Sequence, residues 1–186
     1  MSFRIAKSAA CRLLLLPLLL LAGCSWTGEA FYAASEAQAA IAPGNYRTDE
    51  SASPGPHVVP IRISVLPSGI TSFDLANGER GESLAGFVPL GSDGRFHIFW
   101  LARFDGRDVP ADGVPYGLIE RLADGHYKIY LPDCGHDRAD AVAAGAMPVS
   151  QGGQSDCRFP NRASLEAGMR AYAAHPFDGM ELIPVQ

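Results

Sequence analysis

Residues 132–140 form the densest group of side chains that could carry out chemistry. The segment reads "PDCGHDRAD" and supplies a thiol, an imidazole and three carboxylates, at Asp133, Cys134, His136, Asp137 and Asp140. Zinc binds sulfur, imidazole nitrogen and carboxylate oxygen, with four such ligands in a tetrahedron. Together with Cys157, this segment therefore has the ligand types of a zinc site, for which His136, Asp133 and Asp137 are the candidate ligands.

The same two cysteines favour a different structure. Zinc sites use cysteine pairs at short spacing, whereas Cys134 and Cys157 enclose a long segment that is rich in alanine and glycine. In an oxidising compartment an isolated pair of cysteines forms a disulfide. We therefore predict a Cys134–Cys157 disulfide that closes a solvated acidic loop and stabilises the fold by about 3 kcal/mol. We expect no metal or other cofactor.

The remaining polar residues form no recognisable catalytic motif. The chain lacks the G-x-S-x-G sequence of serine hydrolases, and Ser150 in "MPVSQGG" is its nearest equivalent. Asp105 and Asp108 lie in the turn-rich segment "FDGRDVPADG", where we expect solvated loop charges. His97 and His126 alternate with aromatic residues, so we expect both on the outer face of strands. The sequence therefore favours a protein without enzymatic activity.

The amino-terminal segment has the organisation of a secretory signal peptide. Three cations, Arg4, Lys7 and Arg12, precede an apolar block over residues 13–22. A membrane-spanning helix needs about 20 apolar residues, so this block is too short to span a bilayer. A basic flank, a short apolar core and small residues at its end are typical of a cleaved export signal. We therefore expect the protein to be exported.

The last four residues of this segment, Leu21-Ala22-Gly23-Cys24, resemble the lipobox of bacterial lipoproteins. The resemblance covers the leader alone. It implies cleavage before Cys24, a diacylglycerol on the Cys24 sulfur and acylation of the new amino terminus, and several acyl chains give lasting membrane attachment. Ser25 stands where an aspartate would favour inner-membrane retention in the enterobacterial pattern, so the resemblance implies the outer membrane.

The mature chain would have 163 residues, enough for one ordinary domain. The leader removes three of the fifteen cations and none of the twenty acids, which leaves a net charge of −8. A nucleic-acid-binding protein needs a basic patch, so we expect no nucleic-acid partner. We divide the chain into a cleaved signal peptide (1–23), a lipidated amino terminus and spacer (24–43) and a single periplasmic domain (44–186).

Alternating apolar residues predict a series of β-strands in this domain. The candidate strands are residues 59–66, 70–75, 83–90 and 95–104, a hairpin of 116–122 and 126–131, and a final strand at 180–185. The strand over 95–104 is apolar on both faces, with Ile98 and Trp100 on one and Phe99 on the other, which places it inside a packed structure. Tyr130 falls on the polar face of its strand beside Lys128 and is a candidate ligand-contacting residue.

The carboxy-terminal part of the chain predicts one helix. Asn161 or Ser164 is suited to be its N-cap, and Leu165, Met169 and Tyr172 form an apolar stripe at helical spacing. The predicted fold class is therefore α+β, namely a mostly antiparallel β meander or partly open barrel with one C-terminal helix and one disulfide.

These patterns predict an outer-membrane lipoprotein that faces the periplasm and acts as a non-enzymatic binding or interaction module. Its expected contacts are the membrane, through the lipid on Cys24, and an envelope protein, glycan or lipid ligand. Two alternatives remain open at this point. One is a metal-dependent envelope hydrolase that uses His136 and its acidic neighbours, and the other is a small inhibitor of an enzyme.

Overall fold

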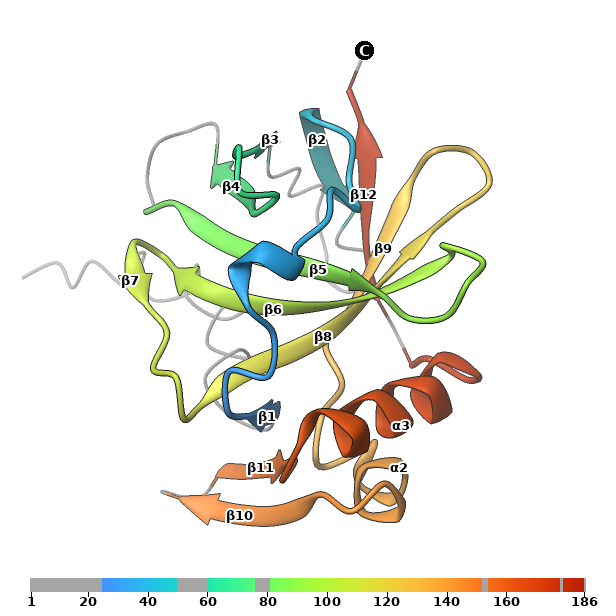
Figure 1. Cartoon of the computed structure of the whole chain (residues 1–186). Helices are drawn as coiled ribbons and strands as arrows, with labels where there is room; N and C mark the ends of the chain where they lie inside the picture. The colour runs from blue at the N-terminus through green and yellow to red at the C-terminus, as the bar shows by residue number, and fades with distance from the viewer. Residues whose placement is uncertain (1–24, 50–59, 76–80, 152–153, 178, 186) are drawn as a thin grey trace, which may run out of the picture.

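The fold is taken from a computed structural model, which describes residues 25–49, 60–75, 81–151, 154–177 and 179–185 (Figure 1). The strands are β1 (Trp26–Gly28), β2 (Gly44–Asp49), β3 (Pro60–Val65), β4 (Thr71–Leu75), β5 (Ser83–Pro89), β6 (Phe96–Phe104), β7 (Arg107–Asp108), β8 (Val114–Arg121), β9 (Tyr127–Tyr130), β10 (Met147–Gln151), β11 (Gln154–Arg158) and β12 (Met180–Pro184). The helices are the 3-10 helix η2 (Ala34–Glu36) and the α-helices α2 (Arg138–Ala143) and α3 (Arg162–Ala173).

Eight of the strands form a closed antiparallel barrel. In chain order they are β2, β3, β4, β5, β6, β8, β9 and β12, and each pairs with the next. Pairing of β12 with β2 completes the circle. The predicted β-rich fold with a helix near its C-terminus is confirmed, but the barrel is closed instead of partly open. The strand that closes it comes after a long insertion, residues 131–179, so no local pattern indicates the closure.

An apolar cluster occupies the barrel interior. Its buried members are Ile41, Tyr46, Ile63, Ala85, Phe87, Phe99, Ile119, Tyr127 and Leu182. Side chains just fill an eight-stranded barrel, or leave room for one small ligand. The residue before β2 that joins this cluster, Ile41, is only 1% exposed. Next to it, the backbone of Ala42 donates to the Tyr127 hydroxyl over 3.2 Å and accepts from the Tyr46 hydroxyl over 2.8 Å, which fixes the chain as it enters the barrel.

A second apolar cluster covers part of the outer wall. Strand β6 separates the two clusters, because Phe99 points into the barrel while Ile98 and Trp100 point outward. The outward side chains pack with α3 and with the amino-terminal segment, which supply Leu165 and Trp26 to the same cluster. In Figure 1 the two α-helices lie below β6 and β8. The predicted burial of both faces of this strand is confirmed.

The amino-terminal segment differs from the predicted spacer, because its described part is built into the domain. Trp26 is fully buried, and its ring lies 5.1 Å from that of Phe159 and 5.7 Å from that of Tyr172 between centroids. Tyr32 and Ile41 are also buried. The segment has few apolar residues, but most of them are large, and each buried aromatic side chain removes a large area from water. A count of apolar residues therefore underestimates how firmly this segment is held.

The insertion between β9 and β12 is more ordered than the solvated loop that the sequence predicts. The Cys134–Cys157 disulfide is present as predicted. Between the two cysteines, however, lie α2 and the hairpin of β10 and β11. Strand β11 also pairs with β1, which is about 130 positions away in the sequence. Pairing with β1 thus stabilises the hairpin, which can therefore form although its own residues bury little apolar surface.

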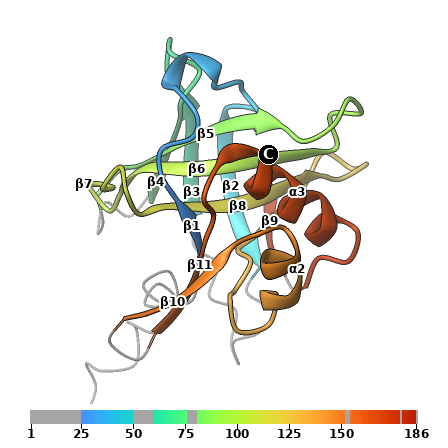
Figure 2. The ribbon, with the colours of Figure 1, turned by 60° about the horizontal axis from the view of Figure 1, so that its bottom comes forward.

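Helix α3 begins and packs as predicted. The side chain of Asn161 accepts a hydrogen bond from the N–H of Ser164 over 2.9 Å, so Asn161 is the N-cap. Leu165, Met169 and Tyr172 are buried along one side of the helix. Figure 2, which brings the bottom of Figure 1 forward, shows α2 beside α3. The insertion therefore forms a separate layer on one side of the barrel.

Candidate functional site at the amino-terminal strand

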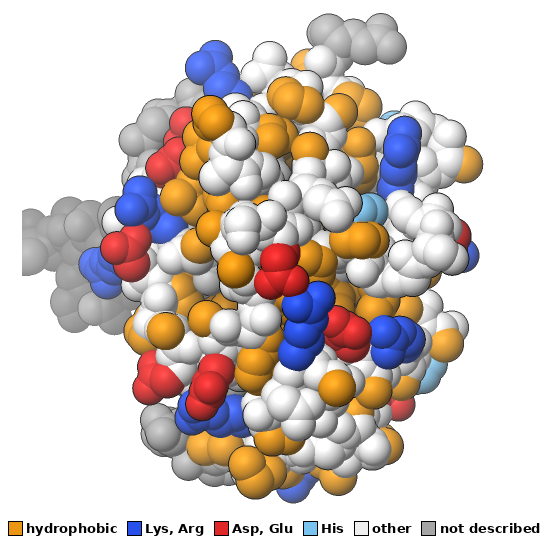
Figure 3. All heavy atoms as spheres, in the orientation of Figure 1, with side chains coloured by type: hydrophobic (Ala, Val, Ile, Leu, Met, Phe, Trp, Pro, Cys, Tyr) orange, Lys and Arg blue, Asp and Glu red, His pale blue; other side chains and the backbone are white. Residues whose placement is uncertain are grey.

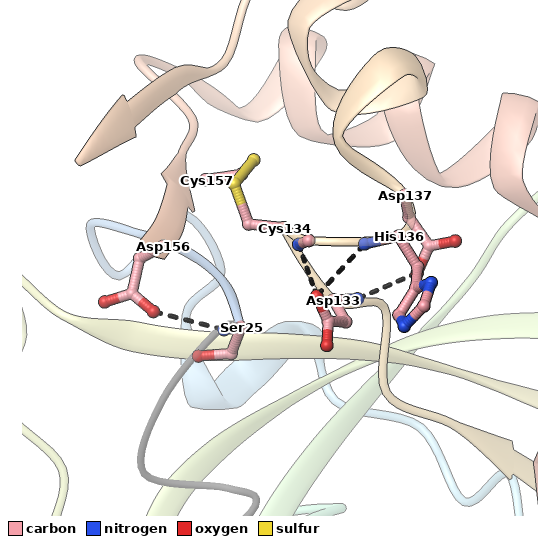
Figure 4. The surroundings of a disulfide bond; sticks show 8 residues. Ser25, Asp133, Cys134, His136, Asp137, Asp156 and Cys157 are labelled. Carbon is pink, nitrogen blue, oxygen red and sulfur yellow. Dashed lines mark hydrogen bonds between the residues drawn. A yellow bond between two sulfur atoms is a disulfide. The ribbon is translucent and has the colours of Figure 1, made fainter. Parts of the chain in front are cut away.

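Strand β1 lies between two strands that are far from it in the sequence. Trp26 pairs with Cys157 of β11 in parallel and with Tyr116 of β8 in antiparallel orientation. The disulfide then joins Cys157 to Cys134, which lies shortly after β9 (Figure 4). Strand β1 is therefore clamped between the barrel and a covalently closed insertion. We call β1, β11, β10 and the disulfide the amino-terminal clamp.

Ser25 is the first described residue and is already fixed in place. Its N–H donates to Oδ1 of Asp156 over 3.1 Å, as drawn in Figure 4, and its carbonyl accepts from the N–H of Cys157 over 3.1 Å. An isolated β-bridge also pairs it with Asp133. Cys24, the predicted lipidation site, lies outside the described residues, so its modification stays a prediction. The clamp nevertheless begins at the very next residue.

Most of the candidate metal ligands have other partners. Because Cys134 and Cys157 form a disulfide, neither sulfur is a free thiolate. Oδ1 of Asp133 accepts hydrogen bonds from the N–H groups two and three residues later, and Oδ2 of Asp137 accepts from the N–H of Asp133 over 2.8 Å. Burial raises the pKa of the Asp137 carboxyl. Within the described ranges, no group of three or more His, Cys, Asp and Glu is arranged to hold a metal ion.

His136 points to the surface. Its ring stacks on the exposed Phe177, with the ring centroids 5.6 Å apart and the planes 15° from parallel. Leu131 and Met180, which lie at the ends of the adjacent strands β9 and β12, are exposed as well. We call Leu131, Phe177 and Met180 the apolar patch. Leu131 and Met180 lie at the ends of paired strands, and Phe177 is three residues before Met180, so these exposed residues lie at the two ends of the insertion.

Tyr130 is buried, in contrast to the exposed position on the polar strand face at which it was a candidate ligand contact. It is 3% exposed, and its hydroxyl donates to Oε2 of Glu120 over 2.6 Å. Burial and this hydrogen bond raise the pKa of the Tyr130 hydroxyl. Arg95 donates to Oε1 of the same carboxylate from Nε over 2.8 Å. Tyr130 and Glu120 therefore form a buried polar pair on the outer wall, against which Tyr172 of α3 packs, while Arg95 reaches the pair from the surface.

His97 lies on the inner face of β6, in contrast to the predicted outer face. It pairs with Ile119, and directly opposite residues of an antiparallel pair project to the same side. Ile119 belongs to the interior cluster. The alternation rule failed here because β6 is apolar on both faces, so neither face could be assigned to solvent.

His97 should make stability fall in mild acid. Burial, and to a smaller extent the charge of Arg121, lower its pKa from the usual 6.5, while Asp93 acts in the opposite direction. The unfolded chain then binds a proton on His97 more readily than the folded chain does. The contribution of the buried, neutral His97 to the free energy of unfolding is therefore fully present above pH 6.5, and it is lost as pH falls toward the lower pKa of the folded state. We expect the free energy of unfolding to decrease between about pH 8 and pH 5, measured by chemical denaturation.

The variant His97→Gln should show a smaller decrease over the same range. His136→Gln is the matched control, because it removes an exposed imidazole and keeps His97. If the wild type and His97→Gln lost the same amount of stability, burial of the His97 ring would not be the cause.

Another contact near β1 has no signal in the sequence. Arg162 on α3 donates to Glu36 over 2.6 Å and to Glu166 over 2.9 Å, and its guanidinium lies 4.4 Å from the ring centroid of Tyr32. Figure 3, in the orientation of Figure 1, shows acidic and basic side chains alternating across the middle of the face that it displays. Glu36 and Arg162 are 126 positions apart, so only the fold reveals that the amino-terminal segment is bonded to α3.

Comparisons with protein-family models, curated proteins and solved structures found no match to this chain. Within the described residues, no helix has both the length and the apolar character needed to cross a membrane. The candidate site therefore has to be interpreted from its own geometry.

Proposed function

We propose that this chain is a bacterial lipoprotein of the outer membrane that faces the periplasm and serves as a non-enzymatic interaction module. The observation that supports this most directly is the position of Ser25. It directly follows the lipobox-like sequence and is bonded to Asp156 and Cys157 at 3.1 Å. A lipid on Cys24 would thus be joined to a rigid domain with almost no intervening chain.

The disulfide fits the same proposal. An exported protein meets an oxidising environment in which such a bond persists. The bond between Cys134 and Cys157 holds β11, and β11 holds the first strand after the predicted anchor. In this arrangement a force on the lipid acts through β1 and β11 on the part of the fold that the disulfide closes.

An interaction role is favoured by where apolar side chains are exposed. Of the six exposed large hydrophobic residues in the described part of the chain, only Val185 lies outside residues 131–180. The apolar patch of Leu131, Phe177 and Met180 is part of this set. Five of the six therefore lie in the insertion or directly after it, and exposed apolar groups gathered in one region mark interaction sites more often than scattered ones do. The proposed contact region is therefore the insertion together with the adjoining start of β12.

The lipid anchor is tested with two cysteine variants of the full chain expressed in a bacterium. Mass spectrometry of the amino-terminal peptide should find a diacylglycerol and an acyl group on Cys24, and the protein should fractionate with membranes. Cys24→Ser should abolish both results, whereas Cys11→Ser, within the leader, should change neither. An unmodified amino terminus that still carries the leucine tract would contradict the proposal.

Sorting to the outer membrane has its own test. In an enterobacterial host, Ser25→Asp should move the protein to the inner-membrane fraction of a density gradient, and Ser25→Ala should not. The Ser25 contacts use backbone atoms, so both variants keep them. Equal distribution of the two variants would remove the support for outer-membrane sorting.

The interaction role is tested by photo-crosslinking in intact cells. A photoreactive residue at Phe177, which is 59% exposed, should form defined adducts with an envelope component. The control position is Val185, which is similarly exposed at 52% but lies outside the insertion. If neither position, or both equally, formed adducts, the apolar patch would not be the contact region.

A further inference from the structure

We infer that the outer face of the amino-terminal clamp lies against the bilayer surface, with Met147 and Val149 of β10 as its apolar contacts. We call Met147, Val149 and Arg158 the anchor face. The partner is the membrane itself, so this inference rests on the proposed lipid at Cys24. It adds an orientation for the whole domain, with the insertion next to the membrane and the opposite end of the barrel away from it.

The strand register places the anchor face close to the predicted lipid. Met147 pairs with Arg158, and Arg158 pairs with Thr27 on β1. Neighbouring strands lie about 4.8 Å apart, so β10 is about 10 Å from β1. Val149 pairs with Asp156, the residue whose side chain binds the Ser25 N–H. A bilayer that holds the acyl chains of Cys24 is therefore within about two strand widths of β10.

The anchor face is accessible. Strand β10 is the terminal strand of the sheet order, and among the described residues it has a partner strand on one side alone. Figure 2 shows it at the outer border of the molecule, with β11 between it and β1. Met147 is 57% exposed, one of the largest values among the hydrophobic residues of the described chain. Val149 is half-buried and, two positions along the strand, points to the same side.

The composition of this region suits contact with lipid. Residues 141–155 contain no charged side chain, which is the longest such run after Cys24. Exposed Val142 precedes the strand. Of the two charged residues of β11 that pair with Met147 and Val149, Asp156 binds the Ser25 N–H through its carboxylate, and Arg158 is half-buried. A cation beside apolar groups favours anionic headgroups, while the absence of charge on β10 lowers the cost of leaving water.

A strand from another protein is a less suitable occupant of this edge. Strand addition depends on backbone donors along the free edge. Pro148 is the second residue of β10 and has no N–H to donate, which is one way in which edge strands avoid pairing. Contact with a bilayer needs no such donors, because it is made by side chains. The side chains of β10 are apolar or uncharged.

Because the clamp is rigid, the short distance between β1 and the anchor face also fixes how the domain is oriented on the membrane. Residues 25 to 28 are held by β11 on one side and β8 on the other. The lipid therefore cannot swing to the far end of the barrel, where the chain ends beyond β12 (Figure 1). With a flexible spacer every face of the domain could reach the membrane. Here one face is always nearest.

The test uses tryptophan as a depth probe in the lipidated full-length product, purified and reconstituted in vesicles. The vesicles contain phosphatidylethanolamine and phosphatidylglycerol with brominated acyl chains, which quench tryptophan on contact. Met147→Trp is compared with Val185→Trp, a site of similar exposure near the C-terminus. Native Trp26 and Trp100 are buried and common to both variants. We expect a loss of fluorescence and a blue shift for the probe at 147 and neither for the probe at 185.

Each outcome decides the inference. Equal quenching at both sites, or quenching at neither while mass spectrometry finds lipid on Cys24, overturns the membrane contact and leaves the anchor intact. An amino terminus without lipid overturns the anchor and the contact together. Val149→Trp is a second probe of the same face, to be used if circular dichroism shows that Met147→Trp does not fold. It should be quenched like the probe at 147, and an unquenched probe there would also contradict the contact.

Discussion

Replacing Trp26 with alanine should lower the free energy of unfolding by about 4 kcal/mol, the middle of the range for large aromatic core side chains. Trp26 is fully buried and packs between the rings of Phe159 and Tyr172. The indole also lies 3.2 Å from where a Cβ on Gly168 would be, so α3 approaches it closely. Alanine would leave a cavity that these neighbours cannot fill. Urea denaturation monitored by circular dichroism measures the difference.

Thr27→Ala is the matched control for this variant. Thr27 is the next residue of β1, is half-buried and points to the opposite side of the strand. Its replacement should change stability by less than about 1 kcal/mol. If Trp26→Ala were as mild as Thr27→Ala, the amino-terminal segment would behave as the spacer that the sequence predicts, and the clamp would not exist in solution.

Removing the disulfide should have the second largest effect. Cys134→Ala with Cys157→Ala opens a loop with a sequence separation of 23. The loop-entropy model gives a loss of about 3 kcal/mol for a loop of this size. Both sulfurs are buried in the outer core, with exposures of 1% and 0%, so some packing is lost as well. Thermal and urea denaturation of the double variant measure the total change.

The loss should be concentrated at the amino-terminal clamp. Without the bond, the N–H of Cys157, which donates to Ser25, should exchange faster with deuterium than the N–H groups of β6. In the double variant the same position carries alanine and can be compared directly. Reductant should destabilise the wild type and leave the double variant unchanged. Uniform exchange over clamp and barrel would show that the disulfide supports the whole fold and not β1 in particular.

Local patterns predicted most of the barrel strands. Alternating side chains identified β3, β4, β5, β6 and the hairpin of β8 and β9 within a few residues of their bounds. Asn161 and the apolar stripe of α3 were also identified, because a cap and a helical period involve residues within a few positions of each other. These features depend on short-range geometry, so a single sequence contains them.

The sequence predicted the strands and helices better than it predicted which face of a strand is buried. His97 was assigned to the outer face of its strand, yet it points into the barrel. Tyr130 was assigned to the polar face of its strand, yet the insertion covers it. Glycine positions show the same limit. The ring of Trp100 lies on Gly86, and that of Phe99 lies on Gly117, so neither glycine has space for a side chain. Which face of a strand is covered depends on what packs there, and that comes from elsewhere in the chain.

The sequence by itself determined most of the barrel strands, the capped helix, the cysteine pair and the lipobox-like leader, because each depends on residues close together or on their chemical type alone. Only the tertiary structure decided that the barrel closes, that the insertion is ordered and that β1 is clamped between β8 and β11. These features join segments that are separated by about 85 to 140 positions. Such contacts form when the whole chain buries its apolar surface, and no local window of the sequence records which distant segment will be the partner.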